Sequence, residues 1–276
     1  MSRPRWFVTL LKKAYPTRFV AARSTRLPLW GRLVEHLLFD GDRMVYLPPD
    51  QVIPVGEEIT VPDEMVLPSQ VVAHFVRAAE TRWIMDRCIC RDAENCRDYP
   101  IDLGCLFLGE AAAGISPKLG RPVTEAEALD HVARAREAGL VHIIGRNKLD
   151  TVWLGVGPGQ RLMTICHCCP CCCLYGILPH LAPHIGAKVT AMPGVHVEVT
   201  DVCIGCGICT QDVCFVEAIR LVGGRAEIGA GCRGCGRCVE LCPQGAIELR
   251  IEEEAFVSTV IAELSAHVDV GGSSDR

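Results

Sequence analysis

The sequence lacks several features that define large classes of protein. No apolar run approaches the ~20 residues that cross a bilayer, so we expect no transmembrane segment. The chain contains no Gly-x-x-x-x-Gly-Lys-Ser/Thr loop, no HExxH motif and no strand-flanked GxGxxG, so nucleotide, zincin and dinucleotide chemistry have no support. The glycine-rich stretch from Gly155 to Gly159 leads into an apolar strand rather than a helix, which predicts a turn.

Acidic residues are missing from the first 34 positions, although the whole chain carries a net charge of -5. This basic arm contains eight cations, Arg3, Arg5, Lys12, Lys13, Arg18, Arg23, Arg26 and Arg32. Trp6, Phe7, Tyr15, Phe19 and Trp30 are interleaved with them. The arm is expected either to pack its aromatics on its own domain, or to dock on an acidic redox protein or the surface of an anionic membrane.

A helix is predicted to begin at Thr124, which forms a capping box with Glu127, and to end at Gly139. Strands predicted at Leu140 to Ile144 and Thr151 to Val156 would complete a hairpin of the kind seen in winged-helix proteins. The helix, however, carries the acidic residues Glu125, Glu127, Asp130 and Glu137. Because it offers no cationic face to phosphates, we expect no nucleic acid partner.

A secretory signal is not expected, because the opening residues lack its apolar core and cleavage site. The chain nevertheless has 18 cysteines, in four groups with none left over. The groups are Cys88 to Cys105, Cys166 to Cys173, Cys203 to Cys214 and Cys232 to Cys242. Such clustering favours thiolate ligation of metal over disulfides, and so predicts a metal-binding protein of the reducing cytoplasm.

The two C-terminal groups form an internal repeat. Cys203-Ile-Gly-Cys-Gly-Ile-Cys209 precedes Cys214, and Cys232-Arg-Gly-Cys-Gly-Arg-Cys238 precedes Cys242 and Pro243. An iron–sulfur cubane needs four thiolates converging on one small object, and the glycines allow the backbone to approach it closely. Each half is expected to form a loop, a short helix and a strand.

This repeat resembles the two-cluster ferredoxins of bacteria over about residues 195 to 251. In that family, the fourth cysteine of each run crosses to the other run's 4Fe–4S cluster. The resemblance implies one ligand set of Cys203, Cys206, Cys209 and Cys242, and another of Cys232, Cys235, Cys238 and Cys214. The first run departs from the family in its longer last spacing and in Phe215, where proline is usual, so its local helix is less certain. Zinc ribbons are disfavoured because their cysteines form two separated pairs.

Four thiols upstream, Cys88, Cys90, Cys96 and Cys105, match the number of ligands that a cubane needs. Arg87, Arg91 and Arg97 lie beside them and could donate to cluster sulfur and offset its charge. The alternatives for this group are buried free cysteine and a structural zinc.

The segment from Cys166 to Cys173 holds six thiols, Cys166, Cys168, Cys169, Cys171, Cys172 and Cys173, together with His167 as a candidate ligand. Adjacent cysteines cannot all point at one metal centre, so we expect three or four of them to be ligands. Two arrangements fit the ten upstream cysteines. Either each group holds its own cluster, which four donors per group favour, or one cluster draws on both groups and leaves spare thiols for a substrate or a less usual metal centre.

With Cys88-Ile-Cys90-Arg91 and the step Gly139-Leu140-Val141, this segment resembles multi-cluster ferredoxin-type proteins of anaerobic bacteria over about Trp83 to Cys242. The resemblance implies one or two 4Fe–4S clusters beyond the two of the repeat. It does not indicate a reaction.

The expected fold class is α+β, with a ferredoxin-like two-cluster module preceded by a mixed α/β N-terminal domain. Helices are predicted around Leu29 to Phe39 and Pro68 to Glu80, with strand and turn between Leu47 and Pro68. The expected segments are a cysteine-free region with the basic arm (1–87), a cysteine-rich redox region (88–194), the ferredoxin domain (195–251), and a C-terminal helix and tail (252–276).

The function predicted from these features is electron transfer, in which two to four 4Fe–4S clusters relay single electrons to or from a partner redox enzyme. The alternative is an oxidoreductase, or a subunit of one, that converts a substrate at a metal centre in Cys166–Cys173 fed by the ferredoxin clusters. A relay needs every iron fully ligated, whereas a catalytic centre needs a vacant or labile position.

Overall fold

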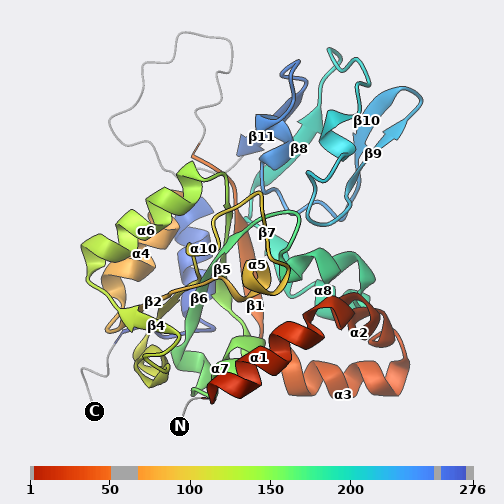
Figure 1. Cartoon of the computed structure of the whole chain (residues 1–276). Helices are drawn as coiled ribbons and strands as arrows, with labels where there is room; N and C mark the ends of the chain where they lie inside the picture. Colours follow the sequence, from red (N-terminus) through yellow and green to blue (C-terminus); the bar gives the residue numbers. More distant parts are fainter. Residues whose placement is uncertain (1–2, 51–67, 252–255, 272–276) are drawn as a thin grey trace.

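The computed structural model describes residues 3–50, 68–251 and 256–271. Figure 1 shows a large central sheet with helices on both sides and a small module of short strands at one end. The fold is mixed α and β, consistent with the expected α+β class. In the described part of the chain, no helix is both long and apolar enough to span a membrane.

The large sheet has seven strands in the order β4-β2-β3-β6-β5-β1-β7, in which only β1 and β7 pair in parallel. The strands are β4 (Gly120–Pro122), β2 (Arg82–Met85), β3 (Leu106–Leu108), β6 (Met163–Cys168), β5 (Val141–Arg146), β1 (Arg43–Leu47) and β7 (Val189–Ala191). Strands from both sides of Cys88 therefore lie in one sheet. The pairing of β3 with β6 brings the two upstream cysteine groups together, because Leu106 lies opposite Ile165.

One face of this sheet is covered by three helices, α4 (Ser69–Ala78), α6 (Glu125–Glu137) and α10 (Phe256–Ser265). Alternate strand residues such as Val45 and Ile165 pack against their apolar side chains. The predicted capping box of α6 is confirmed: the Glu127 amide donates to Thr124 Oγ1, and the Glu127 carboxylate accepts from the Thr124 amide. The C-terminal helix thus belongs to the core of the large sheet.

Other helices cover the opposite face, where Tyr46 and Phe107 point. They are α1 (Arg5–Ala14), η1 (Tyr15–Thr17), α2 (Arg18–Ser24), α3 (Pro28–Leu38), α5 (Ile89–Ala93), η2 (Glu110–Gly114), α7 (Lys148–Leu154), η3 (Gly159–Arg161), η4 (Leu174–His180) and α8 (Pro183–Gly186). The basic arm is therefore helical and packs Phe7 and Phe19 on its own domain.

Two of the predicted helices are confirmed as α3 and α4, but the strand predicted at Thr151–Val156 is wrong. That segment lies mostly in α7, where Asn147 Oδ1 caps the Leu149 amide at 3.1 Å and Gly155 ends the helix with a φ of 68°. Burial of Trp153 and Leu154 outweighs the strand preference of the β-branched residues before them. Of the segment predicted as strand and turn, residues 51–67 lie outside the described residues.

The small module consists of two antiparallel strand pairs that frame the last eight cysteines. Strand β8 (Val195–Val199) pairs with β11 (Ile247–Ile251), and β9 (Ile219–Val222) pairs with β10 (Arg225–Ile228). Each cysteine run includes one short helix, η5 (Ile208–Thr210) in the first and α9 (Arg237–Glu240) in the second. This agrees with the expected succession of loop, short helix and strand.

Candidate metal centres

The first three cysteines of the first run and the last cysteine of the second run border one hollow in the module. They are Cys203, Cys206, Cys209 and Cys242. Backbone amides point at two of these sulfur atoms, with Ala226 N at 3.5 Å from Cys203 Sγ and Ala246 N at 3.3 Å from Cys242 Sγ. Amide donors of this kind stabilise thiolates and cluster sulfur. The donor set and its hollow therefore fit a 4Fe–4S cluster.

A second hollow is bordered by Cys214, Cys232, Cys235 and Cys238. Here Ala218 N lies 3.3 Å from Cys214 Sγ, and Gly234 N lies 3.4 Å from Cys232 Sγ. Burial raises the pKa of Cys235 to about 12, so a metal that takes its thiolate must displace a tightly held proton. Both hollows thus combine cysteines from the two runs, in the same grouping that the ferredoxin resemblance implies.

Tyr46 in β1 also borders the second hollow, and its side chain is fully buried. Its hydroxyl finds no hydrogen-bond partner among the described residues. The pKa of Tyr46 is raised far above its ordinary value, first by burial and then by the nearby thiolates of Cys173 and Cys168, followed by that of Cys235. The hydroxyl therefore lies between the module and the upstream cysteines, where a cluster sulfur would give it the missing acceptor.

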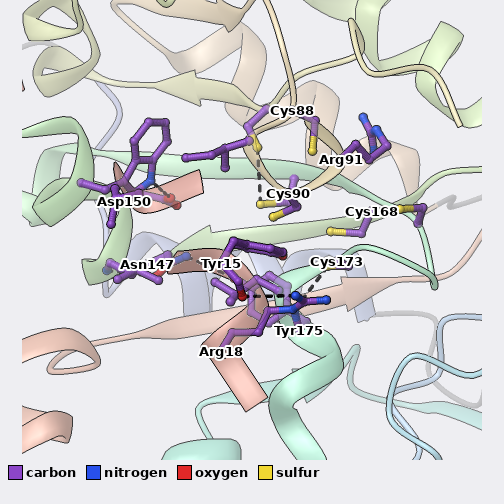
Figure 2. A pocket seen from close by; sticks show the side chains of 18 of the residues that line it. Tyr15, Arg18, Cys88, Cys90, Arg91, Asn147, Asp150, Cys168, Cys173 and Tyr175 are labelled. Carbon is purple, nitrogen blue, oxygen red and sulfur yellow. Dashed lines mark hydrogen bonds between the residues drawn. The ribbon is translucent and has the colours of Figure 1, made fainter. Parts of the chain in front are cut away.

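Seven of the ten upstream cysteines line a cavity of about 320 Å³ beneath the basic arm (Figure 2). One of them, Cys169, also belongs to a second group described below. The other six, Cys88, Cys90, Cys105, Cys166, Cys168 and Cys173, are called the cavity thiols. Strand alternation directs Cys166 and Cys168 of β6 to the same face, and Cys105 Sγ lies 3.9 Å from Cys166 Sγ across the β3–β6 pair. Both upstream groups therefore contribute to this one site.

The cavity thiols differ in their proton affinity. Burial raises the pKa of Cys173 to about 12. The pKa of Cys88 is instead lowered to about 6, mainly by the hydrogen bond from Cys90 and also by the positive charge of Arg91. Cys88 is therefore ionised more readily than Cys173, and a metal entering the cavity would meet a thiolate at Cys88.

Four upstream cysteines, of which Cys169 also lines the cavity, lie together at a second point beside it. In this compact set, the sulfur atoms of Cys96, Cys169, Cys171 and Cys172 all lie within 4.8 Å of one another. Three come from the loop after β6, and Cys96 follows α5 in the chain. The expectation of one cluster in each sequence group therefore differs from the observed grouping, because the β3–β6 pairing mixes the two groups at both points.

Arg91 lies between the cavity thiols and the compact set, and its side chain is fully buried. Its guanidinium donates to the carbonyls of Pro100 (2.7 Å) and His167 (2.6 Å), and also to that of Leu103. Within the described residues, no carboxylate pairs with it. A buried cation needs compensating charge, and the nearest acidic groups are the thiols of Cys88 and Cys169, followed by Cys168 and Cys105. This arrangement fits anionic metal–thiolate centres on both sides of Arg91.

The basic arm forms the roof of the cavity. Leu11, Tyr15 and Arg18 line it, and Tyr15 Oη donates to the Cys172 carbonyl at 2.7 Å. Two arm cations are paired within the domain, Lys12 with Asp92 at 2.6 Å and Arg18 with Glu94. The arm therefore shields the cavity thiols and at the same time ties down the loop that carries the compact set.

His167, the candidate histidine ligand, does not point its Nδ1 at a thiol. That atom lies 2.8 Å from Nδ1 of His142, and the ring also packs at 5.1 Å from that of His131. Burial lowers the pKa of all three histidines, that of His142 to about 3, so these imidazoles are neutral near pH 7. They form a buried neutral cluster that joins α6, β5 and β6.

Several residues of the site were not found from the sequence, namely Tyr46, Tyr175 and Asp150. Asp150 in α7 accepts hydrogen bonds from Trp153 Nε1 and Thr164 Oγ1, and it lines the cavity. The cap at Asn147 and the glycine at 155 are the sequence signals that predict α7 and hence the position of Asp150. Tyr46 has no such signal, because its neighbours come from distant segments.

Comparison with known proteins agrees with the cysteine pattern of the module. Residues 231–248 match the family described as 4Fe-4S binding domain. One component of the ion-translocating oxidoreductase complex of Methanosarcina acetivorans is 51% identical over 49 residues, which are 17% of this chain and 18% of that protein. The chain thus matches less than a fifth of that relative. No solved structure is similar enough to the chain to count as a match. A 4Fe–4S ferredoxin domain is therefore present at residues 231–248, as the second cysteine run predicts.

The close approach of the backbone around the first hollow can be tested at Gly205. Its φ is 67°, and a Cβ there would lie 1.9 Å from the Gly224 carbonyl oxygen. We expect Gly205→Ala to lower iron and sulfide content and the thermal midpoint. Gly223→Ala is the matched control, because Gly223 has a φ of 58° but open space around its Cβ position. Both variants bear the cost of the left-handed backbone, about 1–2 kcal/mol, so equal losses would contradict a role for close packing.

Proposed function

We propose that this protein is an iron–sulfur electron carrier, with two 4Fe–4S clusters in the C-terminal module and a third centre among the cavity thiols. The iron–sulfur chemistry rests on the 4Fe–4S binding domain at residues 231–248 and on the partial similarity to a component of an oxidoreductase complex. The observation that carries the larger proposal is the placement of four cysteines at each of the two module hollows and of the six cavity thiols around one cavity. Each of these sites has at least the four donors that a cubane requires.

The proposed ligand sets follow the hollows. Cys203, Cys206, Cys209 and Cys242 would hold one module cluster, and Cys214, Cys232, Cys235 and Cys238 would hold the other. The third centre would take four of the six cavity thiols. When bound, these clusters supply sites for single electrons. The protein supplies the thiolates, the amide donors and the exclusion of water.

Packed side chains join the three sites into one route. Cys168 and Cys173 share an apolar core with Tyr46, and Cys214, Cys232 and Cys235 pack against that core. The rings of Tyr46 and Tyr175 lie 6.3 Å apart, with Tyr175 on the cavity and Tyr46 on the second hollow. A second small core joins the two module hollows through Cys209, with Cys214 and Cys242 against it. We infer that electrons pass from the cavity through the second module cluster to the first, or in the reverse direction.

An acidic redox protein is the partner we propose, docking where the basic arm covers the cavity. Lys13, Arg23, Arg26 and Arg32 are exposed there, while Lys12 and Arg18 pair internally. The same helices expose large apolar side chains, among them Leu29, Trp30 and Leu33. In Figure 1 these helices lie at the end of the molecule away from the module. An electron would then enter at one end of the route and leave at the other.

The cavity also supports the alternative function. Seven thiols line a space of about 320 Å³, three more than a cubane uses, and Tyr15 and Asp150 place further polar groups on its wall. A centre with a vacant coordination position there would convert a substrate, with the module supplying electrons. Cyanide distinguishes the two functions: a new electron paramagnetic resonance signal from the cavity centre would favour the enzyme, and an unchanged spectrum the carrier.

Metal analysis tests the proposed number of clusters directly. Protein purified without oxygen is expected to contain iron and acid-labile sulfide in near-equal amounts, enough for three cubanes, and to accept three electrons in a reductive titration. An iron content that accounts for the module alone, with the cavity thiols open to alkylation, would contradict a third centre. Zinc without sulfide throughout the chain would contradict the carrier function itself.

Exchange of the fourth cysteines is tested by a matched pair of variants. Cys242→Ser is expected to damage the cluster that takes its other ligands from Cys203, Cys206 and Cys209, because Cys242 borders their hollow. Cys214→Ser is expected to damage the cluster of Cys232, Cys235 and Cys238 instead. Each variant should lose about four irons and the resonance signal of one of the two module clusters. If Cys242→Ser instead lost the signal of the cluster held by Cys232, Cys235 and Cys238, the crossed ligand sets would be wrong.

The charge of Arg91 is expected to set the potential of the cavity centre. Reduction adds negative charge, which the buried guanidinium stabilises, so Arg91→Met should lower the midpoint potential by ~60 mV or more, a tenfold effect for one electron. Arg91→Lys should retain most of the potential. Arg87→Met is the control, because Arg87 is exposed and paired with Asp92. Equal potentials in all three variants would show that Arg91 has only a packing role.

Electrostatic docking predicts a salt-dependent rate of electron transfer to a small acidic flavoprotein. We expect the rate to fall by about tenfold or more from low to high ionic strength. Arg23→Glu combined with Arg32→Glu should lower the low-salt rate, whereas Arg77→Glu on α4 should not. Charge reversal is preferable to deletion of residues 1–32, since the arm also roofs the cavity. A rate independent of salt and of these charges would rule out docking on the arm.

A further inference from the structure

The compact set differs from the other cysteine sites in the spacing of its sulfur atoms. Cys96 Sγ lies 3.8 Å from Cys171 Sγ, and Cys171 Sγ lies 3.6 Å from Cys172 Sγ. All four sulfur atoms, including that of Cys169, lie within 4.8 Å of one another. Among the described residues, no other group of three or more cysteine, histidine or carboxylate side chains converges closely enough to share one ion.

This spacing is that of ligands around one ion. A tetrahedral zinc site with Zn–S bonds of about 2.3 Å places its sulfur atoms about 3.8 Å apart. The four thiolates of a cubane bind four different irons, so they surround a larger object. The two cysteine sets of the module border hollows that could hold such an object, whereas the sulfur atoms of the compact set lie too close together to surround one. The compact set therefore does not fit a cubane.

We propose that Cys96, Cys169, Cys171 and Cys172 bind a single tetrahedral Zn²⁺ ion, separate from the iron–sulfur centres. Four thiolates without an open position are the donor set of structural zinc sites. Cys169 and Cys172 are buried, Cys96 is half-buried and Cys171 is exposed, so protein would enclose most of the ion. Cys169 also lines the cavity, so the site would lie at the edge of that cavity. This inference goes beyond the proposed electron transfer and does not depend on it.

The surroundings of the compact set suit the negative charge that four thiolates retain around a dication. The buried cation Arg91 interacts electrostatically with Cys169, and its hydrogen bond to the His167 carbonyl holds the end of β6, from which the loop leads. Leu103, Ala135 and Leu140 pack around Cys169 and Cys172 and exclude water. The backbone is held as well, because the Cys96 amide donates to the Arg91 carbonyl at 2.9 Å.

The position of the site gives the ion a structural role. It would join the loop after α5 to the loop after β6, in addition to the β3–β6 pairing and the hydrogen bonds of Arg91. Tyr99, three residues after Cys96, packs under the guanidinium of Arg237 at 5.5 Å and accepts its hydrogen bond. Arg237 lies between Cys235 and Cys238 of the module. The zinc would therefore fix the surface on which the ferredoxin module rests.

Metal analysis of the full chain, purified without oxygen and with a chelator in the buffers, tests the proposal. We expect one zinc per chain in addition to iron and sulfide. Cys96→Ser and Cys171→Ser should each remove the zinc and leave iron and sulfide unchanged. Cys203→Ser, which alters a module thiol outside the compact set, is the matched control and should lose iron and sulfide but retain zinc.

Three outcomes would overturn the proposal. One is loss of iron and sulfide together from Cys171→Ser, which would identify a cubane. Another is loss of one iron without sulfide, which would identify a mononuclear iron site. The third is unchanged metal content in both variants. Should Cys96→Ser fold poorly, protein produced with Co²⁺ provides a second measurement, because the visible bands of tetrahedral cobalt thiolate should appear in the native chain and vanish in Cys171→Ser, whose side chain is exposed.

Discussion

The buried guanidinium of Arg91 is the interaction on which the N-terminal half of the molecule depends. It binds two carbonyls of the loop after α5 and one of β6, and it lies between the cavity thiols and the compact set without a carboxylate to balance it in the described part of the chain. A buried cation placed in this way is unfavourable unless its surroundings are anionic. Metal–thiolate centres would supply that charge, so the fold around Arg91 and the filling of the two sites would favour each other.

The module could be predicted from the sequence because its information is local. Three cysteines within seven residues, glycines with positive φ and a repeated fourth cysteine identify the 4Fe–4S domain and the order of its elements. Capping residues likewise indicated α6 correctly. The strand predicted at Thr151–Val156 is wrong because the cap at Asn147 and the glycine at 155 favour a helix over the strand preference of the β-branched residues between them. Buried Trp153 and Leu154 decide that segment, and their burial depends on the rest of the fold.

The division of the ten upstream cysteines could not be predicted from spacing. It depends on the register of β3 against β6, which places Cys105 beside Cys166, and on the loop after α5, which carries Cys96 away from Cys88 and Cys90. A shift of one residue in that register would turn the β6 side chains to the opposite face and separate the thiols. Tyr46 is a similar case, since its neighbours Cys173 and Cys235 belong to segments far apart in the chain.

The crossing of cysteines between segments also sets an order for biosynthesis. None of the four sites is bordered by one continuous stretch of cysteines: the cavity and the compact set need residues from both 88–105 and 166–173, and each module hollow needs a cysteine from the other run. A nascent chain leaving the ribosome therefore exposes Cys88 and Cys90 long before Cys166 and Cys168 follow. During that interval its thiols are open to oxidation or to the wrong metal, and a centre that draws on both groups would form only after β6 has paired with β3.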